Sequence, residues 1–123
     1  MKNKSLVSSF RNAMLGFSTV FREERNMRVH AVTAAAVIVA GVLLKVDGPG
    51  FALLIISIVL VISTELINSS IEYAINMFTD GRQNPMAKKA KDAAAGACFV
   101  CALFSVIVGI AVLLPRIAGL FMK

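Results

Sequence analysis

The sequence has few of the residues and motifs from which common soluble enzymes build their sites. It contains one histidine and two cysteines, so the ligand spacing of a zinc site is missing. Cys98 and Cys101 lie in an apolar run without a further ligand, which favours small packing residues over a redox or metal pair. A Walker-type glycine-rich loop, the protein-kinase signature set and the dinucleotide-binding glycine motif are also missing. These absences exclude the familiar motif-based nucleotide sites.

Acidic residues are scarce as well, and the charge balance bears on possible partners. Thirteen Lys and Arg residues against seven Asp and Glu residues give a net charge of +6. A basic chain can bind nucleic acid, but this one has no basic groove rich in aromatic residues and no known reader motif. The basic residues instead flank long apolar runs, which is typical of a membrane protein. We therefore expect no nucleic-acid partner, and no protein partner is evident.

Apolar residues are abundant, at 58% of the chain with a mean hydropathy of +0.79. An ordinary soluble domain of this size is less apolar. At about 20 residues per crossing, the chain is long enough for one domain of three membrane helices. The N-terminal lysines have no apolar core directly after them, so we expect no cleaved signal peptide. The predicted fold class is an all-α integral membrane protein.

The N-terminal segment, residues 1–28, combines basic residues with an apolar stripe at helical spacing that includes Leu6, Phe10, Phe17 and Phe21. This pattern predicts an amphipathic helix. The helix lies either in the membrane surface, with its arginines toward anionic headgroups, or against the protein's own helices. The two interpretations are compatible.

Membrane helices are predicted over about residues 29–46, 51–78 and 92–114. The Gly-Pro-Gly string at 48–50 is expected to reverse the chain between the first two, and Pro115 to end the third. Residues 79–91 form a polar loop in which Pro85 can open the next helix. The whole chain, residues 1–123, is predicted to be a single membrane domain.

Basic residues also predict the orientation of the chain. By the positive-inside rule, the N-terminal segment and the loop 79–91 lie in the cytoplasm, and the C-terminal Arg116 and Lys123 lie outside. Topology alone explains Lys88 and Lys89. It explains Lys91 less well, because the next residue already heads an apolar helix. The small residues at 93–97 are expected to pack closely against the polar face of the second span.

That polar face carries Glu65, Asn68 and Glu72, whose spacing of i, i+3 and i+7 puts them on one side of a helix. An ionisable side chain in a membrane segment is costly, and is therefore a functional-site hypothesis by default. At 1.5 Å per residue, Glu65 lies about 22 Å from the start of its span and Glu72 about 10 Å further. We expect Glu65 in the far third of a ~30 Å hydrocarbon core, and Glu72 near the interface with water.

Two residues near the first span have alternative interpretations. Glu24 belongs either to a charge cluster that keeps the helix out of lipid, or to the polar site as a third carboxylate. His30 is either an interfacial anchor or a contact to a lipid headgroup.

The acids, Asn68 and Lys91 together suit two kinds of chemistry. Phosphoryl transfer needs a metal on the phosphates, a cation beside them and a base at the acceptor hydroxyl. Carboxylate oxygens suit Mg²⁺. The residues alone leave open a membrane phosphotransferase and an ion or drug transporter.

Three strings in the same order resemble those of the prokaryotic diacylglycerol kinase family. Residues 65–72, Glu-Leu-Ile-Asn-Ser-Ser-Ile-Glu, closely resemble its signature, and residues 90–97, Ala-Lys-Asp-Ala-Ala-Ala-Gly-Ala, resemble its second block. Residues 23–30 are similar to the form in its undecaprenol kinase branch. The resemblance covers nearly the whole chain. It implies a homotrimer in a bacterial cytoplasmic membrane, with active sites where subunits meet, and it implies ATP and Mg²⁺.

The resemblance also implies a reaction and residue roles. The expected reaction is phosphorylation of undecaprenol, with diacylglycerol as the alternative acceptor and a non-enzymatic transporter as a second alternative. Glu65 is implied as the general base at the lipid hydroxyl, and Glu24 and Glu72 as ligands that hold Mg²⁺ with the ATP phosphates. Asn68 is implied to orient the acceptor or a phosphate.

Further roles concern the nucleotide and the lipid. The resemblance implies that Lys91 contacts the phosphates and Asp92 the nucleotide. Arg11 and Asn12 in the surface helix are expected to touch lipid and nucleotide, respectively, and His30 the lipid.

The chain departs from the family pattern in its loop. Residues 80–85 lack the Glu-Tyr-His string of many relatives, and Asn76 stands where many carry an acid. Asp80 is the expected nucleotide contact from this loop.

Overall fold

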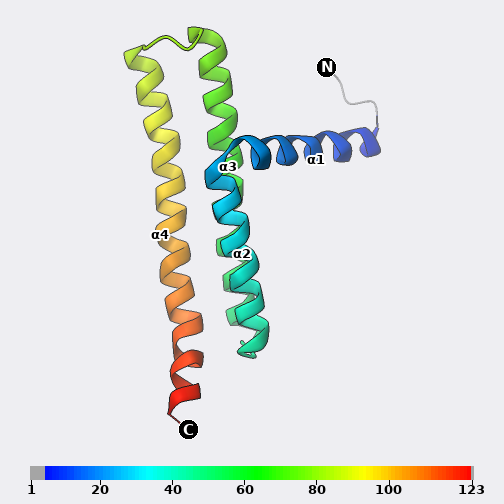
Figure 1. Cartoon of the computed structure of the whole chain (residues 1–123), viewed down its shortest axis with the longest axis vertical. Helices are drawn as coiled ribbons and strands as arrows, with labels where there is room; N and C mark the ends of the chain where they lie inside the picture. Colours follow the sequence, from blue (N-terminus) through cyan, green and yellow to red (C-terminus); the bar gives the residue numbers. More distant parts are fainter. Residues whose placement is uncertain (1–4, 123) are drawn as a thin grey trace.

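The chain folds into four helices joined by short connections, as a computed structural model that describes residues 5–122 (Figure 1). The helices are α1 (Leu6–Glu23), α2 (Arg25–Leu43), α3 (Gly48–Thr79) and α4 (Pro85–Phe121). α3 packs along α4 and against α2, while α1 projects sideways from the bundle (Figure 1). The all-α prediction is confirmed. The predictions for residues 1–4 and Lys123 lie outside the described residues.

α1 begins at Ser5, whose hydroxyl accepts a hydrogen bond from the Ser8 N–H at 3.1 Å and so caps the helix. Its apolar stripe is largely uncovered, since Leu6 is 89% and Phe10 70% exposed. Only Val20, near its end, is buried. The protein's own helices therefore cover one end of α1, and the rest of the stripe is free to meet a membrane surface.

The junction of α1 and α2 lies at Glu24, earlier than the predicted boundary at residue 28. Glu24 has extended backbone, with φ −106° and ψ 115°, and α2 starts at the next residue. Val20 and Met27 are both buried on the two sides of this break. The extended residue Glu24 therefore divides the predicted N-terminal helix, and residues 25–28 belong to α2.

The reversal between α2 and α3 also differs from the prediction. The chain turns over residues 44–47, where Lys45 adopts a left-handed φ of 54°, and the Gly-Pro-Gly string forms the first turn of α3. Asp47 caps this helix by accepting the Gly50 N–H at 2.8 Å. A proline in the first turn costs little, because its missing N–H has no helical partner there.

α4 begins and ends differently from the predicted span. It starts at Pro85, as that proline suggested, and the Asn84 side chain caps it by accepting the N–H groups of Met86 and Ala87. It continues through Pro115 to Phe121, so the prediction that Pro115 ends the helix is wrong. Within a bilayer a break would expose several backbone groups to lipid, whereas a proline inside the helix removes one hydrogen bond.

Three helices, α2, α3 and α4, are long and apolar enough to cross a membrane. Close packing between them depends on small residues: Gly41 is buried, and a Cβ there would lie 3.1 Å from the Phe51 ring. Of the small residues at 93–97, Ala94 is the buried one. Length, composition and exposed apolar faces together describe an integral membrane protein.

Candidate active site

Glu65 is the most deeply buried carboxylate of the described chain, at 3% exposure. Its Oε2 lies 3.8 Å from Nε2 of His30, which α2 supplies and which is 26% exposed. The Cys98 thiol, from α4, interacts with Glu65 and with the neighbouring Thr64. Three helices therefore converge on one carboxylate. A buried charge needs such polar neighbours, since isolated burial is costly.

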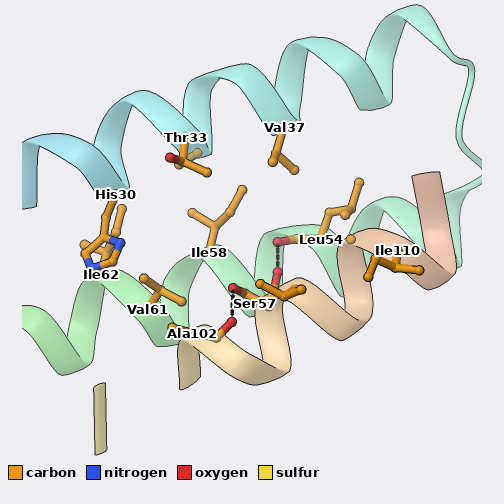
Figure 2. A pocket seen from close by; sticks show the side chains of 14 residues that line it. His30, Thr33, Val37, Leu54, Ser57, Ile58, Val61, Ile62, Ala102 and Ile110 are labelled. Atoms are coloured by element: carbon orange, nitrogen blue, oxygen red, sulfur yellow. Dashed lines mark hydrogen bonds between the residues drawn. The ribbon is translucent and has the colours of Figure 1, made fainter. Parts of the chain in front are cut away.

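An apolar groove of about 300 Å³ starts at His30 and runs between α2, α3 and α4 (Figure 2). Most of its lining is aliphatic. Two of its hydroxyls are turned to their own helices, because Ser57 donates to the Leu54 carbonyl at 2.8 Å and Ser105 to that of Ala102 at 2.7 Å. Apart from the hydroxyl of Thr33, the walls thus offer hydrocarbon surface, and His30 marks one end of the groove. Such a groove suits one hydrocarbon chain.

A second group of carboxylates lies where α3 passes the α1–α2 junction. The Tyr73 hydroxyl donates to Oε2 of Glu23 at 2.8 Å, and the charges of Glu24 and Glu72 act on the same hydroxyl. Glu24 and Glu72 are both partly exposed. The fold therefore brings the two predicted metal ligands, which are far apart in sequence, to one partly hydrated place.

Two buried polar atoms between these places have no hydrogen-bond partner among the described residues. They are Oδ1 of Asn68 and Oγ of Ser69, a residue with 0% exposure. Buried polar atoms are nearly always satisfied, so such an atom indicates a missing partner such as water, a ligand or another subunit. Ser69 was not predicted. Its i+4 spacing from Glu65 was the signal that could have found it.

A polar cleft of about 730 Å³ lies at the loop between α3 and α4. Arg82, Lys88, Lys91 and Asp92 are among its lining residues. The Lys91 ammonium donates to Oδ1 of Asn76 at 2.7 Å, and Lys88 forms an ion pair with Asp92. Clustered cations of this kind bind phosphate oxygens. At 1.5 Å per residue, Lys91 lies about 10 Å along α4 from Cys98 and therefore from the level of Glu65.

A match to a known protein family distinguishes the phosphotransferase from the transporter. The model of the prokaryotic diacylglycerol kinases matches residues 11–113. The chain belongs to this family.

Individual relatives of this family member carry two different names. A diacylglycerol kinase of Synechocystis sp. is 39% identical over 116 residues, which are 94% of this chain and 66% of the relative, so the chain spans about two thirds of its length. An undecaprenol kinase of Bacillus subtilis is 38% identical over 109 residues, which are 89% of this chain and 88% of the relative. A diacylglycerol kinase of Helicobacter pylori is 38% identical over 89 residues, or 72% of this chain and 69% of the relative. The family and these names indicate a lipid kinase.

Some residues that the family resemblance implied are not brought together in a single chain. Arg11 and Asn12 lie in α1, about 20 Å along the helix from the junction at Glu24. Asp80 is the C-cap of α3, with a left-handed φ of 51°, and is not among the residues that line the cleft. The nucleotide and lipid roles of these three residues stay predictions.

The two carboxylates fit a metal that arrives with a nucleotide better than a metal held by protein alone. Within residues 5–122, no group of three His, Cys, Asp or Glu side chains forms a metal site. Mg²⁺ usually keeps several waters and binds one or two carboxylates together with substrate phosphates. Glu24 and Glu72, which are partly exposed and whose charges both act on the Tyr73 hydroxyl, match that mode of binding.

Sequence reasoning also missed Tyr73 and Arg28. Tyr73 follows Glu72 directly, but its bond to Glu23 joins two distant parts of the chain. Arg28 donates to the carbonyls of Phe21 and Arg22 across the helix junction. No spacing rule predicts contacts of this range, since they depend on where the chain bends.

Proposed function

We propose that this family member transfers a phosphoryl group from ATP to the hydroxyl of a membrane lipid, with undecaprenol as the acceptor. The observation that carries the proposal is the position of buried Glu65. It lies 3.8 Å from His30, which lines the head of the apolar groove, and it shares a helix with the partly exposed carboxylate Glu72. A lipid alcohol and a water-soluble nucleotide have to meet at such a boundary.

On the lipid side, the hydrocarbon chain of the acceptor lies in the groove and its hydroxyl reaches His30 and Glu65. Glu65 accepts the hydroxyl proton as the oxygen attacks the γ-phosphorus, the bond from that phosphorus to the β,γ-bridging oxygen breaks, and ADP leaves. General bases of this kind contribute about 10²–10⁴-fold to the rate. Asn68 orients the acceptor or a phosphate, and its Oδ1, which has no hydrogen-bond partner within residues 5–122, supports this role.

On the nucleotide side, Glu24 and Glu72 would hold Mg²⁺ together with the ATP phosphates. When bound, such an ion would supply positive charge beside the β- and γ-phosphate oxygens. Lys91 and Arg82 provide cations for the phosphates, and Asp92 contacts the nucleotide from the same cleft. Lys91 leaves its amide partner Asn76 to do so.

Undecaprenol is favoured over diacylglycerol by residues 23–30, which are similar to the form in the undecaprenol kinase branch. The undecaprenol kinase of Bacillus subtilis also matches along 88% of its own length, against 66% for the Synechocystis diacylglycerol kinase. Diacylglycerol is the alternative acceptor.

The setting that we propose is the cytoplasmic membrane of a bacterium, with the N-terminus and the α3–α4 loop inside and the C-terminus outside. The basic residues near the loop support this orientation. We further propose a homotrimer with active sites at subunit contacts, in which Arg11 and Asn12 of α1 reach lipid and nucleotide of a neighbouring subunit. Asp80 serves the same nucleotide.

One experiment tests the reaction and the acceptor together. Purified protein in mixed micelles receives γ-labelled ATP, Mg²⁺ and either undecaprenol or diacylglycerol, and the extracted lipids are separated. Labelled undecaprenyl phosphate is the expected product. If only phosphatidate is labelled, the acceptor is diacylglycerol instead of undecaprenol. If no lipid is labelled, the proposed function is wrong.

A further inference from the structure

The junction between α1 and α2, residues 21–28, is held by two contacts that the reaction as described does not use. We call this segment the elbow. Arg28, in the first turn of α2, donates through Nη1 to the carbonyls of Phe21 at 3.1 Å and Arg22 at 2.7 Å. Tyr73, on α3, donates to Glu23 at 2.8 Å. Glu24 lies between these contacts, at the one residue where the backbone leaves the helix.

The Arg28 contact sets the direction of α1 relative to α2. The last carbonyls of a helix have no partner within the helix, and a cation is favourable at that end. Arg28 satisfies two of them, and because it belongs to the next helix it also fixes the bend. The other bonds near the bend are few: α2 has no side-chain cap, and the Arg28 N–H meets the Glu24 carbonyl at 3.4 Å.

The Tyr73 contact distinguishes two adjacent carboxylates. Glu23 and Glu24 both lie near the Tyr73 hydroxyl, and the hydroxyl binds Glu23. Glu23 is thereby held by a protein partner, whereas Glu24 and Glu72 act on the same hydroxyl only through their charges. Ligands to a metal need positions fixed to within about 0.5 Å, and outer partners usually supply that precision.

We infer that Arg28 and Tyr73 are positioning residues that hold Glu24 against Glu72 for the metal–nucleotide complex. The inference rests on the proposed function, in which these two glutamates are the metal ligands. Neither side chain touches substrate. Each acts through Glu24, Arg28 by fixing the bend of the elbow and Tyr73 by occupying the competing carboxylate.

The test measures metal binding directly on the full-length protein. Mn²⁺ takes oxygen ligands like those of Mg²⁺ and its binding can be followed by electron paramagnetic resonance, here with a non-hydrolysable ATP analogue. We expect Tyr73→Phe and Arg28→Gln each to raise the Mn²⁺ Kd by about 10-fold, the low end of the effect of losing a direct partner of a metal ligand, because both residues act on Glu24 indirectly. Arg25→Gln is the matched control. It removes one charge from the elbow at an exposed residue, and Mn²⁺ binding should stay at the wild-type value.

Two further measurements separate positioning from general stability. Saturating Mg²⁺ should restore kcat of both variants to within about 2-fold of wild type, because only the alignment of the ligand is lost. Hydrogen exchange should rise in residues 20–28 of Arg28→Gln and stay unchanged in α4. Arg28→Lys keeps the charge and should have an intermediate Kd. Tyr73→Phe loses only a hydroxyl, so it remains a valid test if Arg28→Gln does not fold.

The outcomes distinguish this inference from the proposed function. If Glu24→Gln weakens Mn²⁺ binding while Tyr73→Phe and Arg28→Gln bind like wild type, the positioning role is overturned and the metal role of Glu24 stands. If Glu24→Gln itself binds Mn²⁺ normally, both the positioning role of Arg28 and Tyr73 and the metal role of Glu24 are overturned. A loss of kcat that Mg²⁺ does not restore would also overturn the positioning role.

Discussion

At the residue scale, Glu65 differs from the other acids in its surroundings rather than in its spacing. It is buried beside an imidazole and a thiol, whereas Glu24 and Glu72 remain partly exposed. Burial favours proton exchange with a bound alcohol, and exposure favours a hydrated metal. The same residue type can therefore serve two roles on one helix because the depth differs.

The first prediction concerns Glu65→Gln, which keeps the shape of the side chain and removes its ability to accept a proton. We expect kcat to fall by about 10²–10⁴-fold, while the affinity for Mg²⁺-ATP stays within the wild-type range. Phosphorylated lipid and equilibrium nucleotide binding are measured on the same preparation. Ser70→Ala, exposed on the same helix, is the control. A Glu65→Gln enzyme with normal turnover would remove the base from the mechanism.

The second prediction concerns His30, which lines the groove (Figure 2) and whose Nε2 lies 3.8 Å from Oε2 of Glu65. His30→Ala removes the polar group at the head of the groove, so the KM for the lipid should rise by about 10-fold while the KM for ATP is unchanged. His30→Gln keeps a hydrogen-bonding group, so its KM for the lipid should lie between those of the wild type and His30→Ala. Equal changes in both KM values would argue against a lipid-specific contact and for a general disturbance of the site.

At the element scale, short polar caps set where the helices begin. Asn84 accepts two N–H groups, at 2.8 and 3.1 Å, and it defines the first turn of α4. That turn carries Lys88 into the polar cleft. The placement of the cleft's cations thus depends on one side chain in the loop.

The third prediction is that Asn84→Ala destabilises the protein by about 1 kcal/mol, the usual cost of losing a helix N-cap. Thermal unfolding in detergent measures the change in Tm. Gln83→Ala, the exposed residue before it, is the control and should leave Tm unchanged. The KM for ATP should also rise in Asn84→Ala. A variant with unaltered Tm and KM would show that the cap contributes nothing measurable.

The sequence predicted the helices well, because a long apolar segment in lipid has to form a helix to satisfy its backbone hydrogen bonds. It predicted the helix boundaries poorly where one residue type is compatible with two positions. Both Pro49 and Pro115 were expected to interrupt a helix, yet Pro49 lies in the first turn of α3 and Pro115 lies inside α4. The stripe of Glu65, Asn68 and Glu72 was visible from spacing alone. The elbow was not, because it depends on the bonds of Arg28 and Tyr73 between α1, α2 and α3, which no local pattern encodes.

At the scale of the whole molecule, one chain holds an incomplete set of contacts. Oδ1 of Asn68 and Oγ of Ser69 lack partners within the described residues, and Lys91 is bonded to Asn76 rather than directed at Glu65. α1 carries Arg11 away from the bundle (Figure 1). A second copy could complete such a site without any change in the fold of the first. This is the arrangement that the proposed homotrimer supplies.

The fourth prediction tests that arrangement by mixing two inactive variants. If Glu65 and Lys91 of one active site come from different subunits, Glu65→Gln and Lys91→Ala chains co-expressed in equal amounts will form some sites in which both residues are intact. Random assembly of a cyclic trimer makes that fraction about one quarter, so about a quarter of wild-type activity should return. If both residues come from one subunit, every site stays defective and the mixture is as inactive as its components. Mixing the separately purified variants after assembly is the control, since their subunits remain unexchanged.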